Sequence, residues 1–166
     1  MRKIFPAKGY TPHLGILVSN FSNTRRNTLF LAKNLSVEQL DFNFDYLSNS
    51  IGTLLMHIAA LEFEFLVKQI LNRKPTKIED KKYSNAIGKN MNKRMIKNNN
   101  LEYYVEELTK NRDLIFEKLK NYNDDWLFSE INVSENTTIN NYYLLRHVID
   151  DELCHQGQIK LIRKRL

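Results

Sequence analysis

The feature that most restricts the fold of this chain is a set of four long segments in which apolar residues recur with the period of an α-helix. These segments run from about Pro12 to Lys33, from Asn49 or Ser50 to about Leu71, from Leu101 to about Tyr122, and from Asn140 or Asn141 almost to the C-terminus. The 166 residues include only 5 Gly and 3 Pro, so few positions interrupt a helix. The pattern predicts an all-α, four-helix bundle in which residues 1–166 form one domain.

Local signals support these helices. Asn49 or Ser50 can cap the second helix, and Ser36 and Gln39 can form a capping box for a short turn. Residues 123–139 contain β-branched residues and can form a short extended piece, and Gly52 predicts the close approach of another backbone. The predicted core consists of Leu17, Phe21, Leu54, Ile58, Leu61, Leu108, Ile115, Leu144, Val148 and Ile162.

Positive charge is concentrated in one connection. Residues 73–97 carry 9 Lys and Arg against 2 acidic residues, whereas the whole chain has a net charge of +6. Such a segment can bind phosphates, but it has one aromatic residue, Tyr83, and no recognisable element for reading bases. We therefore expect a solvated connection and no specific nucleic-acid partner.

The expected cellular compartment is inferred from the absence of a disulfide framework, a signal peptide and a membrane-spanning segment in the sequence. A single Cys excludes an internal disulfide framework and is compatible with a reducing cytosol. The first fifteen residues have no apolar core of a signal peptide, and no apolar run is long enough to span a membrane. We expect a cytoplasmic protein without membrane contact.

The stretch HVIDDELCHQGQIKLI, residues 147–162, places two polar side chains on an apolar stripe. On a helical wheel, His155 and several apolar residues fall within about 80° of Asp151. An unpaired buried carboxylate is costly, so Asp151 needs a partner. His57 lies on or beside the buried stripe of the second helix, in LLMHIAALEFEF.

These three side chains suit a metal. Two residues at i and i+4 offer two ligands to one ion, and a His from a facing helix completes a site with open positions. His57, Asp151 and His155 would suit Zn²⁺, Ni²⁺, Mn²⁺ or Fe²⁺. Alternatively, Asp151 and His155 pair with each other, or with Arg146 or Lys160. His147 can be a fourth ligand or can orient the others.

NSIGTLLMHIAALEFEF and, about 90 residues later, LLRHVIDDELCHQGQIKLI resemble motifs of the DinB/YfiT-like superfamily of metalloenzymes, over about residues 13–166. This superfamily includes bacillithiol and mycothiol S-transferases. The resemblance implies a down-up-up-down bundle, a homodimer, and a divalent metal held by one His of the second helix and an H-x3-H pair of the fourth. The family His positions match His57 and His155, but the first His of the pair is here Asp151.

The resemblance also implies a reaction. The metal would bind a low-molecular-weight thiol, which would attack an electrophilic small molecule. The general base is unassigned, with Glu64 and His147 as nearest candidates. The alternative is a non-catalytic metal-binding or stress-response bundle with an altered site.

The family sequence HHRGQ is here CHQGQ, residues 154–158. We expect Cys154 to be a buried, inert thiol, Gly157 to allow close helix packing, and Gln158 to face the core. An Asp ligand adds negative charge, which should make the metal a weaker Lewis acid without abolishing its binding.

Overall fold

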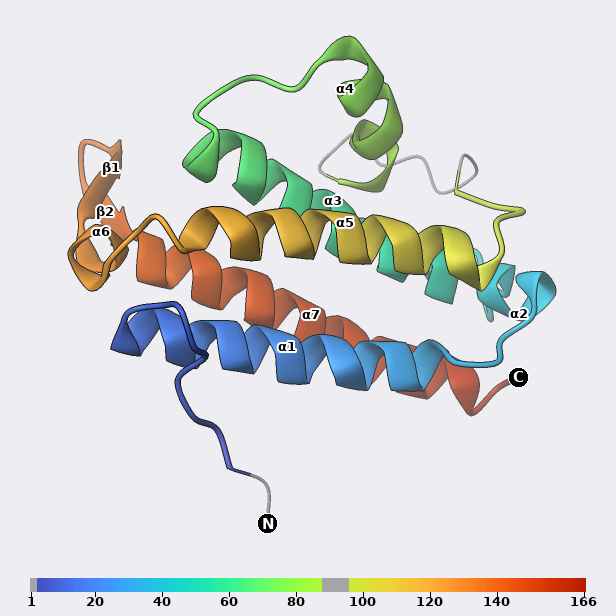
Figure 1. Cartoon of the computed structure of the whole chain (residues 1–166). Coiled ribbons are helices and arrows are strands. Elements are labelled where there is room, and N and C mark those ends of the chain that lie inside the picture. The colour runs from blue at the N-terminus through green and yellow to red at the C-terminus, as the bar shows by residue number, and fades with distance from the viewer. Residues whose placement is uncertain (1–2, 88–95) are drawn as a thin grey trace.

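The computed structural model describes residues 3–87 and 96–166. Its long helices are α1 (Pro12–Ala32), α3 (Ile51–Phe65), α5 (Leu101–Leu119) and α7 (Asn141–Arg163). In Figure 1, α1 and α7 run in one direction and α3 and α5 run in the other, which is the down-up-up-down arrangement. Each long helix packs against two others, in the cyclic order α1, α7, α3, α5. The predicted all-α, four-helix bundle is confirmed.

The predicted helix starts are also found. Ser50 accepts a hydrogen bond from the Thr53 amide at the start of α3, and Asn140 accepts one from the Tyr143 amide at the start of α7. The Ser36 capping box opens α2 (Val37–Asp41). At its C-terminal end, α3 passes into a π-helical turn, η1 (Leu66–Ile70).

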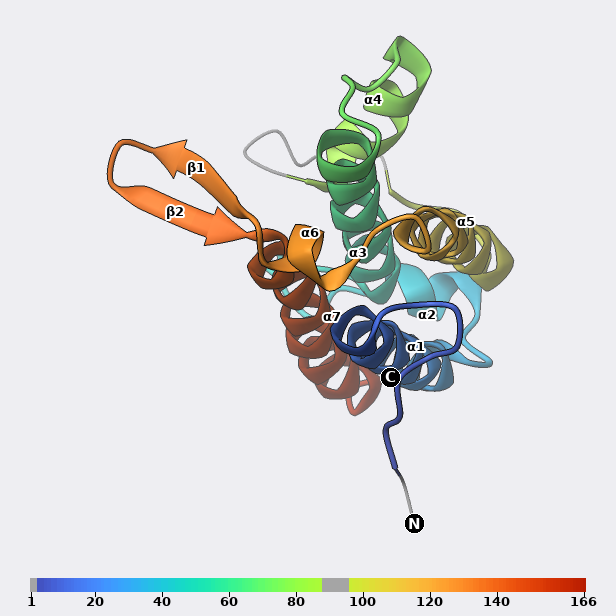
Figure 2. The ribbon, with the colours of Figure 1, turned by 60° about the vertical axis from the view of Figure 1, so that its left-hand side comes forward.

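The long connections contain structure of their own. Residues 123–139 include α6 (Asp124–Phe128) and most of a hairpin of β1 (Glu130–Ser134) and β2 (Thr137–Asn140), which projects from the bundle in Figure 2. The expected extended piece is therefore present. Among the described helices, none combines the length and the apolar character needed to cross a lipid bilayer.

The basic segment is more than a solvated connection. It contains α4 (Lys77–Tyr83), opened by a Thr76 capping box, and the turn η2 (Ser84–Ala86). Tyr83 is buried and stacks on Phe63 of α3, and Ala86 is fully buried. Arg73, Lys74, Lys77 and Lys81 are exposed, as expected of a solvated connection, while Tyr83 and Ala86 anchor this part on α3. Residues 88–95 lie outside the described part.

Two apolar clusters fill the bundle toward its opposite ends. One gathers around Leu54, Ile58 and Leu108, and the other around Phe21 and Ile115.

Eight of the ten predicted core residues are buried, whereas Leu61 and Leu144 are only partly buried because they line a groove between α3 and α7. Gly52 does permit a close approach, but by a side chain rather than a backbone: a Cβ there would lie 2.5 Å from Tyr104 Oη.

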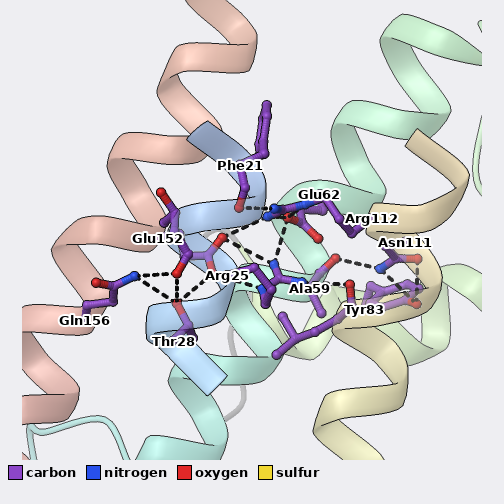
Figure 3. Close-up of polar contacts among 12 residues, drawn as sticks. Phe21, Arg25, Thr28, Ala59, Glu62, Tyr83, Asn111, Arg112, Glu152 and Gln156 are labelled. Atoms are coloured by element: carbon purple, nitrogen blue, oxygen red, sulfur yellow. Dashed lines mark hydrogen bonds and ion pairs between the residues drawn. The ribbon is translucent and has the colours of Figure 1, made fainter. Parts of the chain in front are cut away.

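Between the two clusters lies a buried layer of charge, shown in Figure 3. Each long helix contributes one member of what we call the charged quartet: Arg25, Glu62, Arg112 and Glu152. Arg25 Nε donates to Glu152 Oε1 over 2.9 Å, and Arg25 Nη2 donates to Glu62 Oε1 over 2.8 Å. Arg112 Nε donates to Glu62 Oε1 over 2.7 Å, and Arg112 Nη2 donates to Glu152 Oε2 over 2.8 Å.

Neutral groups complete this layer. Thr28 Oγ1 donates to Glu152 Oε1 over 2.6 Å. Gln156 Nε2, one turn further along α7, donates to the Thr24 carbonyl over 2.9 Å. Burial alone would raise the pKa of Glu152, but Arg25 and Arg112 hold it below its ordinary value. The carboxylate is therefore stabilised in its charged form inside the bundle.

Replacing Glu152 by Leu should destabilise the protein strongly. The side chain is fully buried, and its loss leaves two buried guanidinium groups sharing one carboxylate. Removing one partner of a buried ion pair costs about 3–5 kcal/mol of unfolding free energy. Urea denaturation followed by circular dichroism measures this loss. The control Glu117→Leu, at a side chain 65% exposed, should stay within about 0.5 kcal/mol of the parent, and an equal loss in both variants would contradict the role of the quartet.

The start of α1 takes its cap from α6. Asp124 accepts hydrogen bonds from Thr11 Oγ1 and from the amides of His13 and Leu14, the first residues of the helix. Burial alone would raise the pKa of Asp124, but these hydrogen bonds lower it from 3.8 to about 2. The carboxylate thus satisfies amides that have no partner within the helix.

This cap predicts a loss of stability in acid. Because the folded pKa lies below the unfolded value of about 3.9, the contribution of Asp124 is complete above that pH and disappears as the pH falls toward 2. Thermal unfolding of Asp124→Asn and of the parent at pH 6 and pH 2.5 tests this. The difference between their midpoints should shrink in acid, and a constant difference would contradict the cap.

Candidate metal centre

Three side chains from two antiparallel helices meet between α3 and α7. His57 comes from α3, and Asp151 and His155 lie one turn apart on α7. His57 Nε2 lies 3.6 Å from Asp151 Oδ2, and His155 Nε2 lies 3.3 Å from the same oxygen. Each side chain offers a donor atom, and these atoms all lie within 4.8 Å of one another. The three residues singled out in the sequence are therefore brought together.

The spacing of the donor atoms fits a shared cation. Ligands at 2.0–2.2 Å in tetrahedral positions stand about 3.4 Å apart. The observed separations of 3.3 Å and 3.6 Å lie on either side of that value. Asp151 Oδ2 and both ring nitrogens of His155 are buried without a hydrogen-bond partner among the described residues. Buried polar atoms are rarely left without a partner, so the residues present fit a divalent metal ion.

A backbone group outside the two helices orients His57. The Ala86 carbonyl, at the end of η2, lies 2.7 Å from His57 Nδ1. A proton on Nδ1 leaves the Nε2 lone pair free, and Nε2 is the nitrogen that faces Asp151. The sequence did not predict this contact, because no residue pattern shows which backbone carbonyl, 29 residues further along the chain, will lie next to His57.

Contacts among the three side chains also shift the pKa values of His57 and Asp151. Burial alone would lower the pKa of His57, but Asp151 and the Ala86 carbonyl raise it above its ordinary value. Burial alone would raise the pKa of Asp151, but His155 and His57 hold it well below its usual range. Asp151 therefore carries its negative charge at neutral pH, as a metal ligand must.

Arg146 does not compete for Asp151. It pairs with the neighbouring Asp150, to which its Nε donates over 3.1 Å. His147 is exposed, stacks on Tyr143 and is not a member of the three-residue cluster in the described part of the chain. It lines the groove beside the cluster instead.

The buried stripe of α7 is centred differently from the prediction. Its centre is Glu152, which is fully buried and faces α1, whereas Asp151 is partly exposed and faces α3. Cys154 and Gln158 are exposed, and nothing lies within 4 Å of a Cβ placed on Gly157, so these three expectations were wrong. The reason is that α7 packs between α1 and α3, so its buried arc is turned toward α1.

Two pockets lie along α3, on the C-terminal side of His57. One, of about 220 Å³, lies between α3 and α7 and is lined by Leu61, Glu64, Leu144 and His147, among others. The other, of about 290 Å³, lies between α3 and the 75–87 segment. Both pockets lie along α3 beyond His57, and neither lining includes His57, Asp151 or His155.

Comparisons with known proteins identify the relationship. A family model described as mycothiol S-transferase matches residues 16–166. The chain belongs to the mycothiol S-transferase family, a DinB/YfiT-like family. The resemblance recognised in the sequence is confirmed, and DinB-like families bind a divalent metal.

One solved structure supports the fold of this family member. A conserved protein from Enterococcus faecalis aligns with a TM-score of 0.71, covering 90% of this chain and 94% of the other. The two sequences are 14% identical, so the likeness concerns the fold alone. No curated protein matches this chain.

Asp151→Leu should abolish metal binding and leave the bundle folded, because Leu suits a partly buried position between α3 and α7. Calorimetric titration of the metal-free protein with Zn²⁺ measures the binding, and circular dichroism checks the fold. Asp150→Leu is the matched control, since its side chain is half-exposed and pairs with Arg146. Equal Zn²⁺ binding by the parent and Asp151→Leu would contradict a metal centre at these residues.

Proposed function

We propose that this protein transfers a low-molecular-weight thiol to an electrophilic small molecule, using a divalent metal held by His57, Asp151 and His155. The observation that carries the proposal is the convergence of three donor atoms at ligand spacing, two of them on residues whose buried donor atoms have no other partner. Membership of the mycothiol S-transferase family supports the reaction class.

Two imidazoles and one carboxylate suit Zn²⁺, Ni²⁺, Mn²⁺ or Fe²⁺ and leave positions for a substrate atom. A metal held here would lower the pKa of a bound thiol, so that the thiolate would form near neutral pH. His57 and His155 would hold the metal as neutral ligands, and the Ala86 carbonyl next to His57 Nδ1 favours the tautomer whose Nε2 is free for the metal.

A proton acceptor is available in the adjoining groove. His147 and Glu64 both line it, and they come from α7 and α3 respectively. The Glu64 carboxylate is paired with Lys68, whereas the exposed His147 ring has no ion-pair partner among the described residues. We assign the role of general base, which accepts the proton of the thiol, to His147, because imidazole is the most frequent general base in enzymes.

The reaction balances with these groups. The thiolate sulfur forms a bond to the electrophilic carbon, the leaving group departs with the electron pair of the broken bond, and the thiol proton passes to His147. Asp151 contributes a negative charge where the family has a neutral His. This charge should weaken the acidifying effect on the thiol relative to a three-His centre.

Activity can be tested with monochlorobimane, which becomes fluorescent when a thiolate displaces its chloride. Mycothiol, bacillithiol and glutathione serve as the thiols, in a Cys154→Ser background that removes the exposed protein thiol. We expect metal-dependent turnover with one of them, lost in Asp151→Leu and kept in Asp150→Leu.

Asp151→His should keep metal binding and shift the pH profile of the transfer to lower pH, since a neutral ligand strengthens the Lewis acid. Zn²⁺ binding without turnover for any thiol or metal would favour the non-catalytic bundle.

A further inference from the structure

The pocket of about 290 Å³ between α3 and the 75–87 segment has an apolar floor and a polar rim. The floor is formed by buried residues, namely Ala60, Phe63, Val67 and Tyr83. Phe63 and Tyr83 stack on each other with ring centroids 4.3 Å apart, so two aromatic rings border the pocket. Pockets of this size and lining hold small, largely apolar molecules.

The pocket begins about one helical turn beyond His57 on α3. Ala60 lies three residues after His57 on α3, about 4.5 Å further along the helix axis. On the other wall, Ile87 directly follows Ala86, whose carbonyl holds the His57 ring. Both walls therefore continue from the residues that position His57.

A pair of side chains separates this pocket from the groove that contains His147. Glu64 and Lys68 line both spaces and form an ion pair with each other. Glu64 lies two helical turns, about 10.5 Å, beyond His57 along α3. The two spaces are thus separate and lie on either side of this ion pair.

The rim indicates which charge the occupant carries. Its charged members are Glu64, Asp80 and Lys68, and Lys68 is already paired with Glu64. Among the described residues, the rim has no cation left over for an anionic ligand. A carboxylate or phosphate on the occupant would lie near Asp80, which has no ion-pair partner within residues 3–87 and 96–166, and above a floor that cannot solvate it.

We propose that this pocket binds the electrophilic substrate, and that the substrate is an uncharged, largely apolar molecule with a flat ring. The inference rests on the proposed function, since it assigns the acceptor of the transferred thiol. The ring would lie against the Phe63 and Tyr83 wall, with its reactive carbon toward His57. The thiol would then occupy the groove lined by His147.

Binding can be tested without any reaction. The unreactive probe 2-naphthol is an uncharged bicyclic ring, and 2-naphthoate is its anionic counterpart of similar shape. Amide shifts of the ¹⁵N-labelled, Zn²⁺-loaded protein should saturate with 2-naphthol, with the largest changes at Ala60, Val67 and Ser84. The anion should bind at least about tenfold more weakly. Equal binding of both compounds, or shifts centred on the His147 groove, would overturn the assignment.

Variants separate this pocket from the rest of the surface. Ile87→Trp and Ser84→Phe each fill the pocket from the 75–87 segment and should weaken 2-naphthol binding by about tenfold. The matched control is Ile78→Trp, on the same segment but 82% exposed and outside the pocket lining, which should bind like the parent. Unchanged binding in both filling variants would overturn the inference.

Kinetics distinguish a failure of the pocket from a failure of the proposed function. If the protein transfers thiols, Ile87→Trp should raise the KM for monochlorobimane and leave the KM for the thiol unchanged. If the KM of Ile87→Trp for monochlorobimane is unchanged, the pocket assignment is wrong but the transferase activity is not contradicted. If 2-naphthol binds as expected and no thiol is transferred, the pocket stands as a ligand site and the proposed function fails.

Discussion

Two arginines and two glutamates, one from each long helix, meet at the centre of this bundle, away from water. Apolar side chains alone would let neighbouring helices slide or rotate with modest loss, whereas a misplaced buried charge is costly. The quartet therefore fixes the rotation of each helix about its axis. On α7, Glu152 and Gln156 are held against α1, which turns Asp151 and His155 toward α3. The geometry of the metal centre depends on this constraint.

Much of the fold could be predicted because it is local. Helical periodicity, few helix breakers and capping residues such as Ser50 and Asn140 act over a few positions, and the structure follows them. The grouping of His57, Asp151 and His155 was also predictable. An i and i+4 pair converges on any helix, and the motif resemblance supplied the facing His.

The remaining features depend on contacts between distant segments. A single-helix wheel placed Asp151 at the centre of the stripe, since it could not show that α7 lies between two neighbours and buries Glu152 instead. Glu62 was overlooked, although an acidic residue within an apolar stretch is a signal for a buried cation. The Ala86 carbonyl had no signal at all, and the basic segment is anchored through Tyr83, Ala86 and Ile96, which pack against parts of the chain distant in sequence.

The exposure of Cys154 has a practical consequence. It is the single cysteine of the chain, it lies on the outer surface of α7, and it directly precedes His155. A nitroxide or fluorophore attached to this thiol would lie one residue from a candidate ligand without disturbing the interior. Paramagnetic broadening or quenching by Ni²⁺ or Mn²⁺ would then report occupancy of the centre in the native sequence, with no engineered labelling position.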